Sequence, residues 1–297
     1  MNENRTRAAS ADLTRYIEQA AEPRTRPDGS GYRSLLHQDE AWIVGLTGLS
    51  HRAVQVAALH RQIVPERYSR NQRTLCCDEQ LRLLASHVAI IGLGGLGGTV
   101  LEILARIGLG KLTLVDGDRF EDSNLNRQML STPGLLGQMK AEAAGRRVAE
   151  LNPAVQSRIF TEFFTDENGL EILDDVDIAV DCLDTIPARF LLEEKCRQRR
   201  IPMVSAAIGG TSGQATVVFP EDSGLKRIYG TSTRTAQRGV EASLGTLPFA
   251  ATAMAAIECA EVVALAAGRT VQLRDKLLIG DFSDHSLDKI SFLHTED

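Results

Sequence analysis

The stretch Val88–Asp118, "VAIIGLGGLGGTVLEILARIGLGKLTLVDGD", decides the fold of this chain. A short apolar run leads directly into a glycine-rich turn, an apolar helical pattern follows the turn, and a second apolar run ends at Asp116. The glycines of the turn that we expect to matter are Gly92, Gly94, Gly95 and Gly97. A strand, a glycine turn, a helix and a second parallel strand form the βαβ unit that binds nucleotides. The stretch therefore predicts a Rossmann-like nucleotide-binding unit.

The spacing of the turn, G-x-G-x-x-G, has a physical explanation at each glycine. The first permits a tight turn, the second lets a phosphate approach the backbone, and the third allows close packing of the helix. The helix N-terminus offers free N–H groups to an anion. Asp116 ends the next strand, where its carboxylate can accept hydrogen bonds from ribose hydroxyls. Turns of this kind hold NAD, FAD, S-adenosylmethionine and ATP, so the nucleotide stays open at this point.

Outward from this unit, apolar runs alternate with helical patterns, which predicts an α/β fold. We expect a doubly wound, mostly parallel sheet with helices on both faces. The expected strands are Val88–Ile91, Leu112–Val115, Val155–Phe160, Asp177–Val180, Pro202–Ser205 and Ala215–Phe219. Helices are expected near residues 97–107, 137–150 and 187–199. The apolar segment 246–268 contains Glu258 and Glu261, which favours a buried core or dimer helix over a membrane span.

The chain divides into two parts by pattern. We expect an N-terminal extension at residues 1–66 and the α/β domain at residues 67–297. Residues 1–30 are polar and end in "PRTRPDGSG", which predicts a flexible or loosely attached segment. Residues 32–65 have a mainly helical pattern, with Ser50 as the N-cap of a helix at residues 53–62.

The bulk properties of the sequence argue against several classes of protein. The net charge is -6, with 33 Lys+Arg against 39 Asp+Glu, which does not suggest a broad nucleic-acid surface. We see neither a signal segment nor a membrane-spanning run, and we expect a cytoplasmic protein. The five cysteines contain no C-x-x-C pair, so no structural zinc is expected.

The polar residues that follow the turn favour a triphosphate. They are Asp118, Asn124, Arg127, Gln128, Lys140 and Asp184. A dehydrogenase needs an apolar nicotinamide slot, and it has no use for two cations and a further carboxylate. Arg127 and Lys140 can neutralise phosphate oxygens. Asp184 follows a strand, where a carboxylate can hold Mg²⁺ beside phosphates.

These residues also resemble a known family. "RYSRN" (67–71), "GLGGLG" (92–97), "DGD" (116–118), "SNLNRQ" (123–128), Lys140 and "DCLD" (181–184) occur in the order typical of the ThiF/MoeB/HesA family. That family is related to the ubiquitin-activating enzymes, and the resemblance covers roughly residues 67–268. It implies that the domain binds ATP and adenylates a carboxylate, releasing pyrophosphate.

The resemblance also implies roles for individual residues. Asp116 would bind ribose, and Asn124, Arg127 and Lys140 would contact phosphates. Asp184 would bind Mg²⁺. Arg70 would reach into the site of a partner subunit, which requires a homodimer.

Plainer roles stay open for the same side chains. Arg127, Lys140 and Arg70 could be solvated surface charges. Asp184 could cap the helix that starts near Pro187, and Gln128 could be a structural hydrogen-bonding residue.

The sequence departs from the family in three respects. The loop at residues 220–245 contains no cysteine, although many ubiquitin-activating relatives have a nucleophilic cysteine there. Thr185 stands where the family usually has Asn, and the first 66 residues have no counterpart. Of the cysteines, Cys182 and Cys259 are expected to be buried. Cys196 lies on a cationic helix and Cys76–Cys77 lie near Arg70, but we expect no catalytic role for them.

The favoured interpretation is therefore an adenylyltransferase that works without an enzyme thioester. Its expected substrate is the C-terminal Gly-Gly carboxylate of a ubiquitin-like sulfur-carrier protein, as in molybdopterin, tungstopterin or thiamine sulfur transfer. A tRNA-bound threonylcarbamoyl group and a small-molecule carboxylate are the alternatives within adenylation. The basic cluster "KCRQRR" (195–200) and Arg146–Arg147 are weak hints of tRNA. A nucleotide-sensing scaffold and an oxidoreductase are alternatives from other classes.

Overall fold

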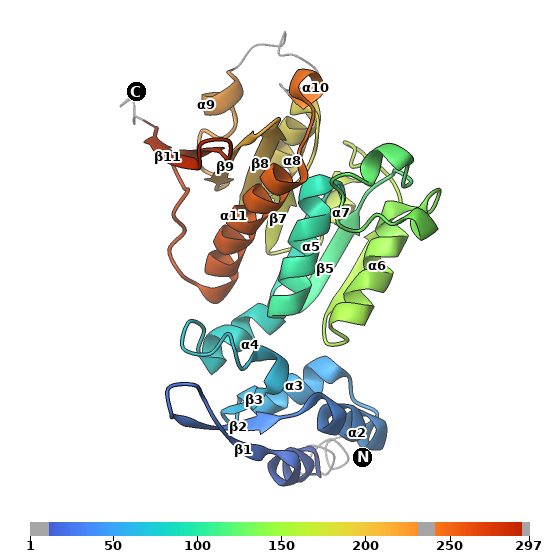
Figure 1. Cartoon of the computed structure of the whole chain (residues 1–297), viewed down its shortest axis with the longest axis vertical. Coiled ribbons are helices and arrows are strands. Elements are labelled where there is room, and N and C mark those ends of the chain that lie inside the picture. The colour runs from blue at the N-terminus through green and yellow to red at the C-terminus, as the bar shows by residue number, and fades with distance from the viewer. Residues whose placement is uncertain (1–11, 231–240, 293–297) are drawn as a thin grey trace.

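The structure, a computed structural model, describes residues 12–230 and 241–292. A small N-terminal unit is stacked on an α/β domain along the long axis of the molecule (Figure 1). The domain is built on an eight-stranded sheet with the order β11-β10-β9-β8-β7-β4-β5-β6. The expected α/β fold with a doubly wound sheet is confirmed.

One side of the sheet is parallel and the other is antiparallel. The parallel strands are β4 (His87–Ile91), β5 (Lys111–Val115), β6 (Gln156–Phe160), β7 (Ile178–Asp181) and β8 (Met203–Gly209). The antiparallel strands β9 (Ser212–Val218), β10 (Lys276–Asp281) and β11 (Ser286–Ser291) extend the sheet beyond β8. The six predicted strands agree with β4 to β9 within a few residues, whereas β10 and β11 were not predicted.

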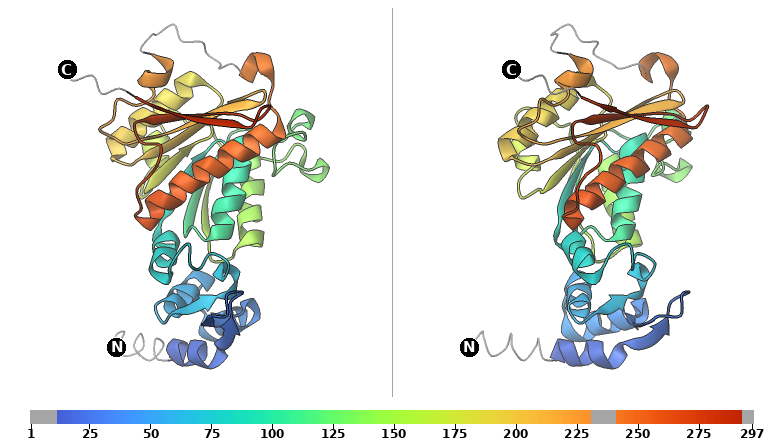
Figure 2. Two further views of the ribbon diagram at one scale, coloured as in Figure 1. Left: turned by 60° about the vertical axis from the view of Figure 1, so that its left-hand side comes forward. Right: turned by 90° about the vertical axis from the view of Figure 1, so that its left-hand side faces the viewer.

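Helices cover both faces of the sheet, as Figure 2 shows in two further views. On one face lie α5 (Gly95–Ile107), α6 (Lys140–Leu151) and α11 (Pro248–Ala267), and on the other α7 (Gly169–Ile172), α8 (Ile186–Arg199) and α9 (Lys226–Tyr229). Successive residues of a strand point to opposite faces. Accordingly, Val88 and Ile90 belong to the core beneath α5, and Ala89 and Ile91 belong to the core beneath α8.

Helix α11 is long and apolar enough to cross a membrane, judged by length and composition alone. It packs against α5 and against strands β8 and β9. Half of its most apolar window is buried inside the protein. The buried face includes Met254, Cys259 and Val262, which is the packing expected of a core helix.

The N-terminal unit contains more regular structure than its sequence predicted. Residues 12–20 are helical, and a three-stranded sheet is formed by β1 (Glu22–Thr25), β2 (Gly31–Leu35) and β3 (Ile63–Pro65). The helices α2 (His37–Thr47) and α3 (His51–Leu59) lie between β2 and β3 in the chain. Ser50 is the N-cap of α3, as expected, and its side chain accepts from the Ala53 amide at 3.2 Å.

The expectation of a loosely attached segment is wrong for residues 12–30, while residues 1–11 lie outside the described chain. The polar run "PDGS" forms the turn of the β1–β2 hairpin. Gly29 has a φ of +84°, and Asp28 accepts hydrogen bonds from the amide and the hydroxyl of Ser30. Aspartate and glycine favour turns as strongly as they favour linkers. Ile17, in the helix at residues 12–20, is fully buried among residues of α2 and α3. This packing fixes that helix on the N-terminal unit.

Two short elements connect the unit to the α/β domain. They are the 3-10 helix η1 (Glu66–Tyr68) and the helix α4 (Cys77–Ala85). Two further 3-10 helices, η2 (Asp122–Asn124) and η3 (Pro133–Leu135), follow β5, and a short helix, α10 (Glu241–Leu244), precedes α11. The boundary at residue 66/67 falls within η1 and stays a prediction.

Candidate functional site

A cavity of about 390 Å³ opens at the carboxyl ends of the parallel strands. It lies where β5 and β7 flank β4, so connections leave β4 in both directions. Such a switch point is where open α/β sheets bind ligands. Among the lining residues are ten of the predicted site residues: Gly92, Gly94, Gly95, Asp116, Asp118, Asn124, Arg127, Gln128, Lys140 and Asp184. The volume is typical of small-molecule sites.

The glycine turn is required by the backbone around it. Gly92 has a φ of +92°, and a Cβ there would lie 2.6 Å from the carbonyl oxygen of Cys182. A Cβ on Gly97 would lie 1.9 Å from the carbonyl oxygen of Gly92. By contrast, a Cβ on Gly94 would meet only the Gln128 side chain, at 3.7 Å. Gly92 and Gly97 therefore shape the turn, whereas Gly94 keeps space open at the cavity.

Asp116 and Asp118 form the acidic wall of the cavity. The buried Asp116 carboxylate accepts from the amides of Leu93 and Asp118, both at 2.8 Å. Burial raises the pKa of Asp116, although Lys140 and the two amides lower it. The Lys140 ammonium lies 2.9 Å from Asp118 Oδ2, and its side chain is only 7% exposed. A buried cation is thus fixed beside the glycine turn.

Some polar side chains of "SNLNRQ" have hydrogen-bond partners in the protein, whereas one has a polar atom that remains available to a ligand. Asn124 Oδ1 accepts from the Glu121 amide at 3.1 Å, which closes η2. Arg127 is half-buried, and its guanidinium donates to Ser123 O and Asn126 Oδ1, both at 2.9 Å. Gln128 Oε1 is buried and has no hydrogen-bond partner among the residues that the structure describes. Because buried polar atoms are rarely left unpaired, Gln128 points to a donor that a ligand would supply.

Asp184 lies in the loop after β7 and lines the cavity. It is exposed, and within residues 12–230 and 241–292 its carboxylate has no hydrogen bond or ion pair. The N-cap of α8 is Thr185, whose side chain makes no capping bond. The alternative role of Asp184 as a helix cap is therefore not supported.

A buried cluster beneath this loop was not predicted. The Arg189 guanidinium donates to Asp181 Oδ2 at 2.9 Å, to Ala206 O at 2.6 Å and to Leu183 O. Asp181 is fully buried and also accepts from Ser205 Oγ at 2.6 Å. Burial lowers the pKa of Arg189, but the Asp181 carboxylate, together with Tyr229, Glu258 and Cys182, raises the pKa above the usual value. Arg189 thus fixes the backbone of the loop that carries Asp184.

Apolar walls complete the cavity. Phe163, Phe164 and Ile208 line it. The Phe163 ring lies against Gly117, where a Cβ would approach it to 2.9 Å. Sequence reasoning missed these residues, although Gly117 between two aspartates is a signal of close contact.

Arg70 does not line this cavity. The preceding Tyr68 packs against Gly108, directly after the C-terminus of α5, whereas the cavity lies at the N-terminus of α5. A helix of 13 residues separates them, which corresponds to about 20 Å. Arg70 therefore lies too far away to contact the cavity of its own chain.

Three of the described cysteines are poor nucleophiles. Burial raises the pKa of Cys182, Cys196 and Cys259, which keeps these thiols protonated. No group of three or more His, Cys, Asp or Glu side chains suited to a metal ion occurs in the described chain. A magnesium ion held between phosphates needs only one or two protein carboxylates.

The site suits a ligand that has a negatively charged phosphate end and a partly apolar end. Helix N–H groups, Lys140 and Arg127 can contact phosphates. Asp116 and the partnerless Gln128 oxygen are suited to hydroxyl or amine donors, and Phe163 offers an apolar wall. A nucleoside triphosphate has these features, and it fits the residues present.

Comparison with known proteins gives the family. The ThiF family model matches residues 68–294. A SAMP-activating enzyme E1 from Haloferax volcanii is 34% identical over 238 residues, which is 76% of this chain and 85% of that protein. The adenylyltransferase and sulfurtransferase MOCS3 of Drosophila yakuba is 36% identical over 165 residues. That match covers 54% of this chain and 36% of MOCS3, so this chain spans only about a third of that relative.

Solved structures share the fold. E. coli MccB with ATP has a TM-score of 0.65 at 20% identity, covering 86% of this chain and 83% of MccB. PaaA has a TM-score of 0.62 at 23% identity, covering 77% of this chain and 82% of PaaA. At these identities the likeness concerns the fold.

Proposed function

The chain belongs to the ThiF family, and from that premise we propose that it is an ATP-dependent adenylyltransferase. Its proposed substrate is the C-terminal glycine carboxylate of a ubiquitin-like sulfur-carrier protein. Two relatives support this choice, since one is named as a SAMP-activating E1 and the other as an adenylyltransferase and sulfurtransferase. The observation that carries the proposal is the cavity itself, where Asp184 and Gln128 Oε1 lack partners in the described part of the chain and lie beside the cations Lys140 and Arg127.

In the proposed reaction, a carboxylate oxygen attacks the α-phosphorus of ATP. The new O–P bond gives R–CO–AMP, the bond to the β-phosphate oxygen breaks, and pyrophosphate leaves. Lys140 and Arg127 stabilise the charge on the phosphates, and the N-terminus of α5 offers its amides. Asp116 orients the ribose. No covalent enzyme group takes part, so positioning and electrostatics provide the rate enhancement.

Asp184 is the proposed ligand of Mg²⁺. The exposed carboxylate at the cavity suits a hard cation that keeps most of its waters. When bound, the ion would neutralise charge on the phosphates. Arg189 would keep the loop of Asp184 in place through its bond to Leu183 O.

The proposal excludes an enzyme-bound thioester. Cys182, Cys196 and Cys259 are thiols with raised pKa, and a thiolate is the nucleophile that such chemistry needs. Residues 220–245, expected to cover the carrier tail, contain no cysteine. Of this loop, residues 231–240 lie outside the described chain.

We further propose a cytoplasmic homodimer in which Arg70 acts on the cavity of the partner subunit. The support is geometric, because Arg70 is exposed and lies beyond the far end of α5 from its own cavity. In a dimer with twofold symmetry contacts are reciprocal, so each copy would receive Arg70 from the other.

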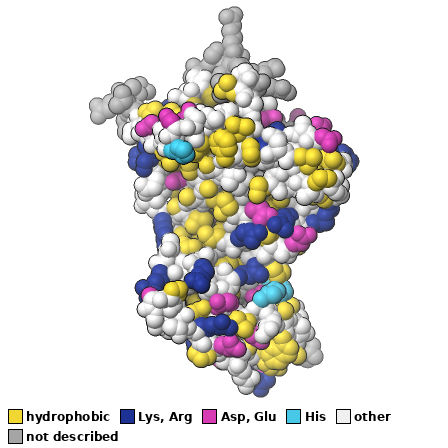
Figure 3. Space-filling view, in the orientation of Figure 1, with side chains coloured by type: hydrophobic (Ala, Val, Ile, Leu, Met, Phe, Trp, Pro, Cys, Tyr) yellow, Lys and Arg dark blue, Asp and Glu magenta, His cyan; other side chains and the backbone are white. Residues whose placement is uncertain are grey.

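Adenylation of a tRNA-bound group is the second candidate. Its support is weak, because four of the six basic side chains that suggested tRNA are paired with carboxylates. Arg147 contacts Glu102, Lys195 contacts Asp166 at 2.5 Å, and Arg199 contacts Asp174 at 3.1 Å. Figure 3 shows Lys and Arg interleaved with Asp and Glu around the junction of the two units. A mixed surface attracts a phosphate backbone less than a basic one.

The test is ATP–pyrophosphate exchange with Mg²⁺ and a panel of carrier proteins ending in Gly-Gly. We expect exchange that requires the terminal glycine and falls by about 10²–10³-fold in Asp184→Ala. The melting temperature of this variant should stay unchanged, because within residues 12–230 and 241–292 Asp184 has no partner to lose. Exchange with tRNA or small acids alone would replace the carrier, and ATP binding without any exchange would favour a nucleotide-sensing scaffold.

A further inference from the structure

The segment 66–73, which carries Arg70, is fixed at most of its positions. Glu66 accepts hydrogen bonds from two residues of β2, from Tyr32 Oη at 2.9 Å and from Ser34 Oγ at 2.5 Å. Burial would raise the pKa of Glu66, but these hydrogen bonds and one from Ser69 hold it below its usual value. The start of the segment is therefore bound to the hairpin of the N-terminal unit.

A buried chain of hydrogen bonds fixes the middle of the segment. Glu40 on α2 accepts from Gln55 Nε2 at 2.9 Å, and Gln55 Oε1 accepts from Tyr68 Oη at 3.0 Å. Tyr68 Oη in turn accepts from Asn152 Nδ2 at 3.0 Å, at the end of α6. Burial raises the pKa of Tyr68 to about 12, so its hydroxyl keeps the proton that it donates. Tyr68 thus joins the N-terminal unit to the α/β domain.

The end of the segment is also held. Asn71 Nδ2 donates to Gln80 Oε1 at 3.1 Å, and Gln80 Nε2 donates to Ile107 O at 2.8 Å. Arg73 donates to Ser30 Oγ at 3.2 Å in the hairpin turn. Arg70, between these contacts, is exposed and has no polar partner in the described chain. A free cation therefore projects from an immobilised backbone.

We propose that the N-terminal unit, residues 12–65, is a scaffold that positions Arg70 for the cavity of a second copy of this chain. Tyr68, which links this unit to the α/β domain, is the central positioning residue. This inference rests on the proposed adenylation and on the proposed role of Arg70. An arginine that is only solvated at the surface does not require a backbone fixed by so many hydrogen bonds. Fixing its backbone in advance reduces the freedom that is lost when it meets the charge of the transition state.

The test uses heterodimers in which one site can work. One subunit carries Arg70→Ala and the other carries Lys140→Met, and two affinity tags isolate the mixed dimer. If Arg70 acts across the interface, the Arg70→Ala subunit keeps an intact cavity and receives Arg70 from its partner. The mixed dimer should then show about half of the wild-type exchange activity, because one of two symmetric sites is complete. Each homodimer of the variants should be nearly inactive.

Tyr68→Phe is then added to one subunit at a time. On the Lys140→Met subunit, which donates Arg70, it should lower kcat about tenfold and leave the KM for ATP unchanged. On the Arg70→Ala subunit, which holds the working cavity, it should have little effect. A general loss of stability would act from either subunit, so this asymmetry separates positioning from folding.

Tyr32→Phe is the second variant in case Tyr68→Phe does not fold. It removes one of several bonds to Glu66 and should reproduce the asymmetry more weakly. Tyr16→Phe is the matched control, because Tyr16 lies in the same unit and its ring packs on Trp42.

The outcomes separate the inference from its premises. Absence of exchange in the wild type would overturn adenylation and the inference together. Exchange in the wild type without activity in the mixed dimer, or failure to recover a mixed dimer, would overturn the role of Arg70 and hence the scaffold, but not adenylation. Activity in the mixed dimer with equal loss from either position of Tyr68→Phe would overturn the scaffold alone.

Discussion

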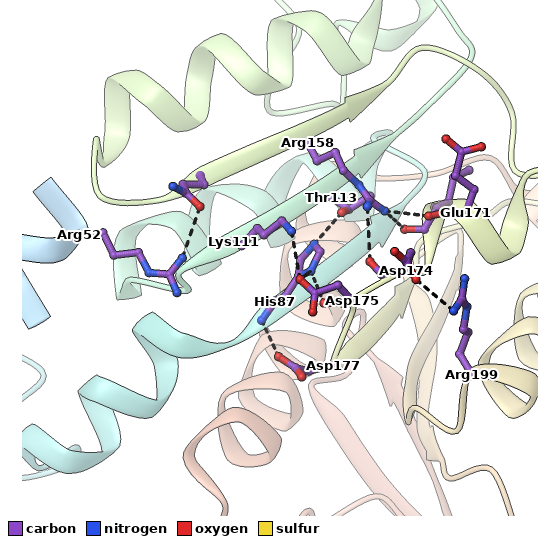
Figure 4. Close-up of polar contacts among 12 residues, drawn as sticks. Arg52, His87, Lys111, Thr113, Arg158, Glu171, Asp174, Asp175, Asp177 and Arg199 are labelled. Carbon is purple, nitrogen blue, oxygen red and sulfur yellow. Dashed lines mark hydrogen bonds and ion pairs between the residues drawn. The ribbon is translucent and has the colours of Figure 1, made fainter. Parts of the chain in front are cut away.

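The two ends of the parallel sheet are both rich in charged and polar side chains, but they use them differently. At the carboxyl end, Asp184 has no partner in the described chain and Gln128 Oε1 is buried without one. At the amino end, the polar residues in Figure 4 bond to one another and to the backbone. What distinguishes the carboxyl end is open hydrogen-bonding capacity that faces a cavity.

The amino end centres on His87, the first residue of β4. Its backbone amide donates to Asp177 Oδ2 at 2.8 Å, and its ring contacts Asp175 O and, at 2.8 Å, Thr113 Oγ1. Lys111 pairs with Asp175 at 3.4 Å (Figure 4). These contacts join the starts of β4, β5 and β7. They hold strands in register and leave little capacity for a ligand.

The largest expected difference is between two lysines. Lys140→Met should lower the rate of ATP–pyrophosphate exchange by about 10²–10³-fold, because it removes a fixed cation beside the phosphates. Lys111→Met should change exchange less than about twofold, since a partly exposed ion pair contributes about 0–1 kcal/mol and lies at the other end of the sheet. Steady-state exchange assays on both variants make the comparison. Equal losses of exchange activity would mean that the two ends are coupled. The presence of side chains without hydrogen-bond partners would then not locate the site.

A smaller effect separates two glycines of the same turn. Gly97→Ala should destabilise the fold by about 1–3 kcal/mol, as overpacking does, because its Cβ would lie 1.9 Å from Gly92 O. Gly94→Ala should leave the free energy of unfolding nearly unchanged and raise the KM for ATP, because its Cβ meets only Gln128, at 3.7 Å, beside the cavity. Urea unfolding and ATP titrations distinguish the two. A large stability loss in Gly94→Ala would contradict the assignment of Gly94 to the open side of the turn.

The contrast also explains how much the sequence could predict. The strands β4 to β9 and the grouping of ten polar and glycine residues at one edge follow from local patterns, because parallel strands bring their carboxyl ends together. The Arg189–Asp181 pair was missed because a charged helix residue gives no sign of its burial until Ser205 and Ala206 are placed beside it. The Tyr68–Asn152 bond joins residues 84 positions apart. The β1–β2 hairpin was missed because its exposed β1 residues resemble a linker.

The smallest predicted effect is on the pH dependence of stability, and it concerns His87 at the amino end of the sheet. Burial, aided by Lys111 and Arg158, lowers the pKa of His87 below 6.5, although its contact with Asp175 O raises it. The unfolded chain therefore takes up a proton near pH 6.5 that the folded chain does not. The stability that His87 contributes is present above that pH and is lost as the pH falls toward the folded pKa.

His87→Gln keeps a donor and an acceptor in the side chain but cannot be charged. Between pH 7.5 and pH 5.5, the free energy of unfolding of the wild type should therefore fall by up to about 1 kcal/mol more than that of the variant. Urea denaturation at three pH values across this range measures the difference. Exchange activity at pH 7.5 should be the same in both proteins, because the five residues of β4 place His87 about 15 Å from the cavity. Parallel pH profiles of stability, or a loss of activity in the variant, would show that the amino end is not a purely structural region.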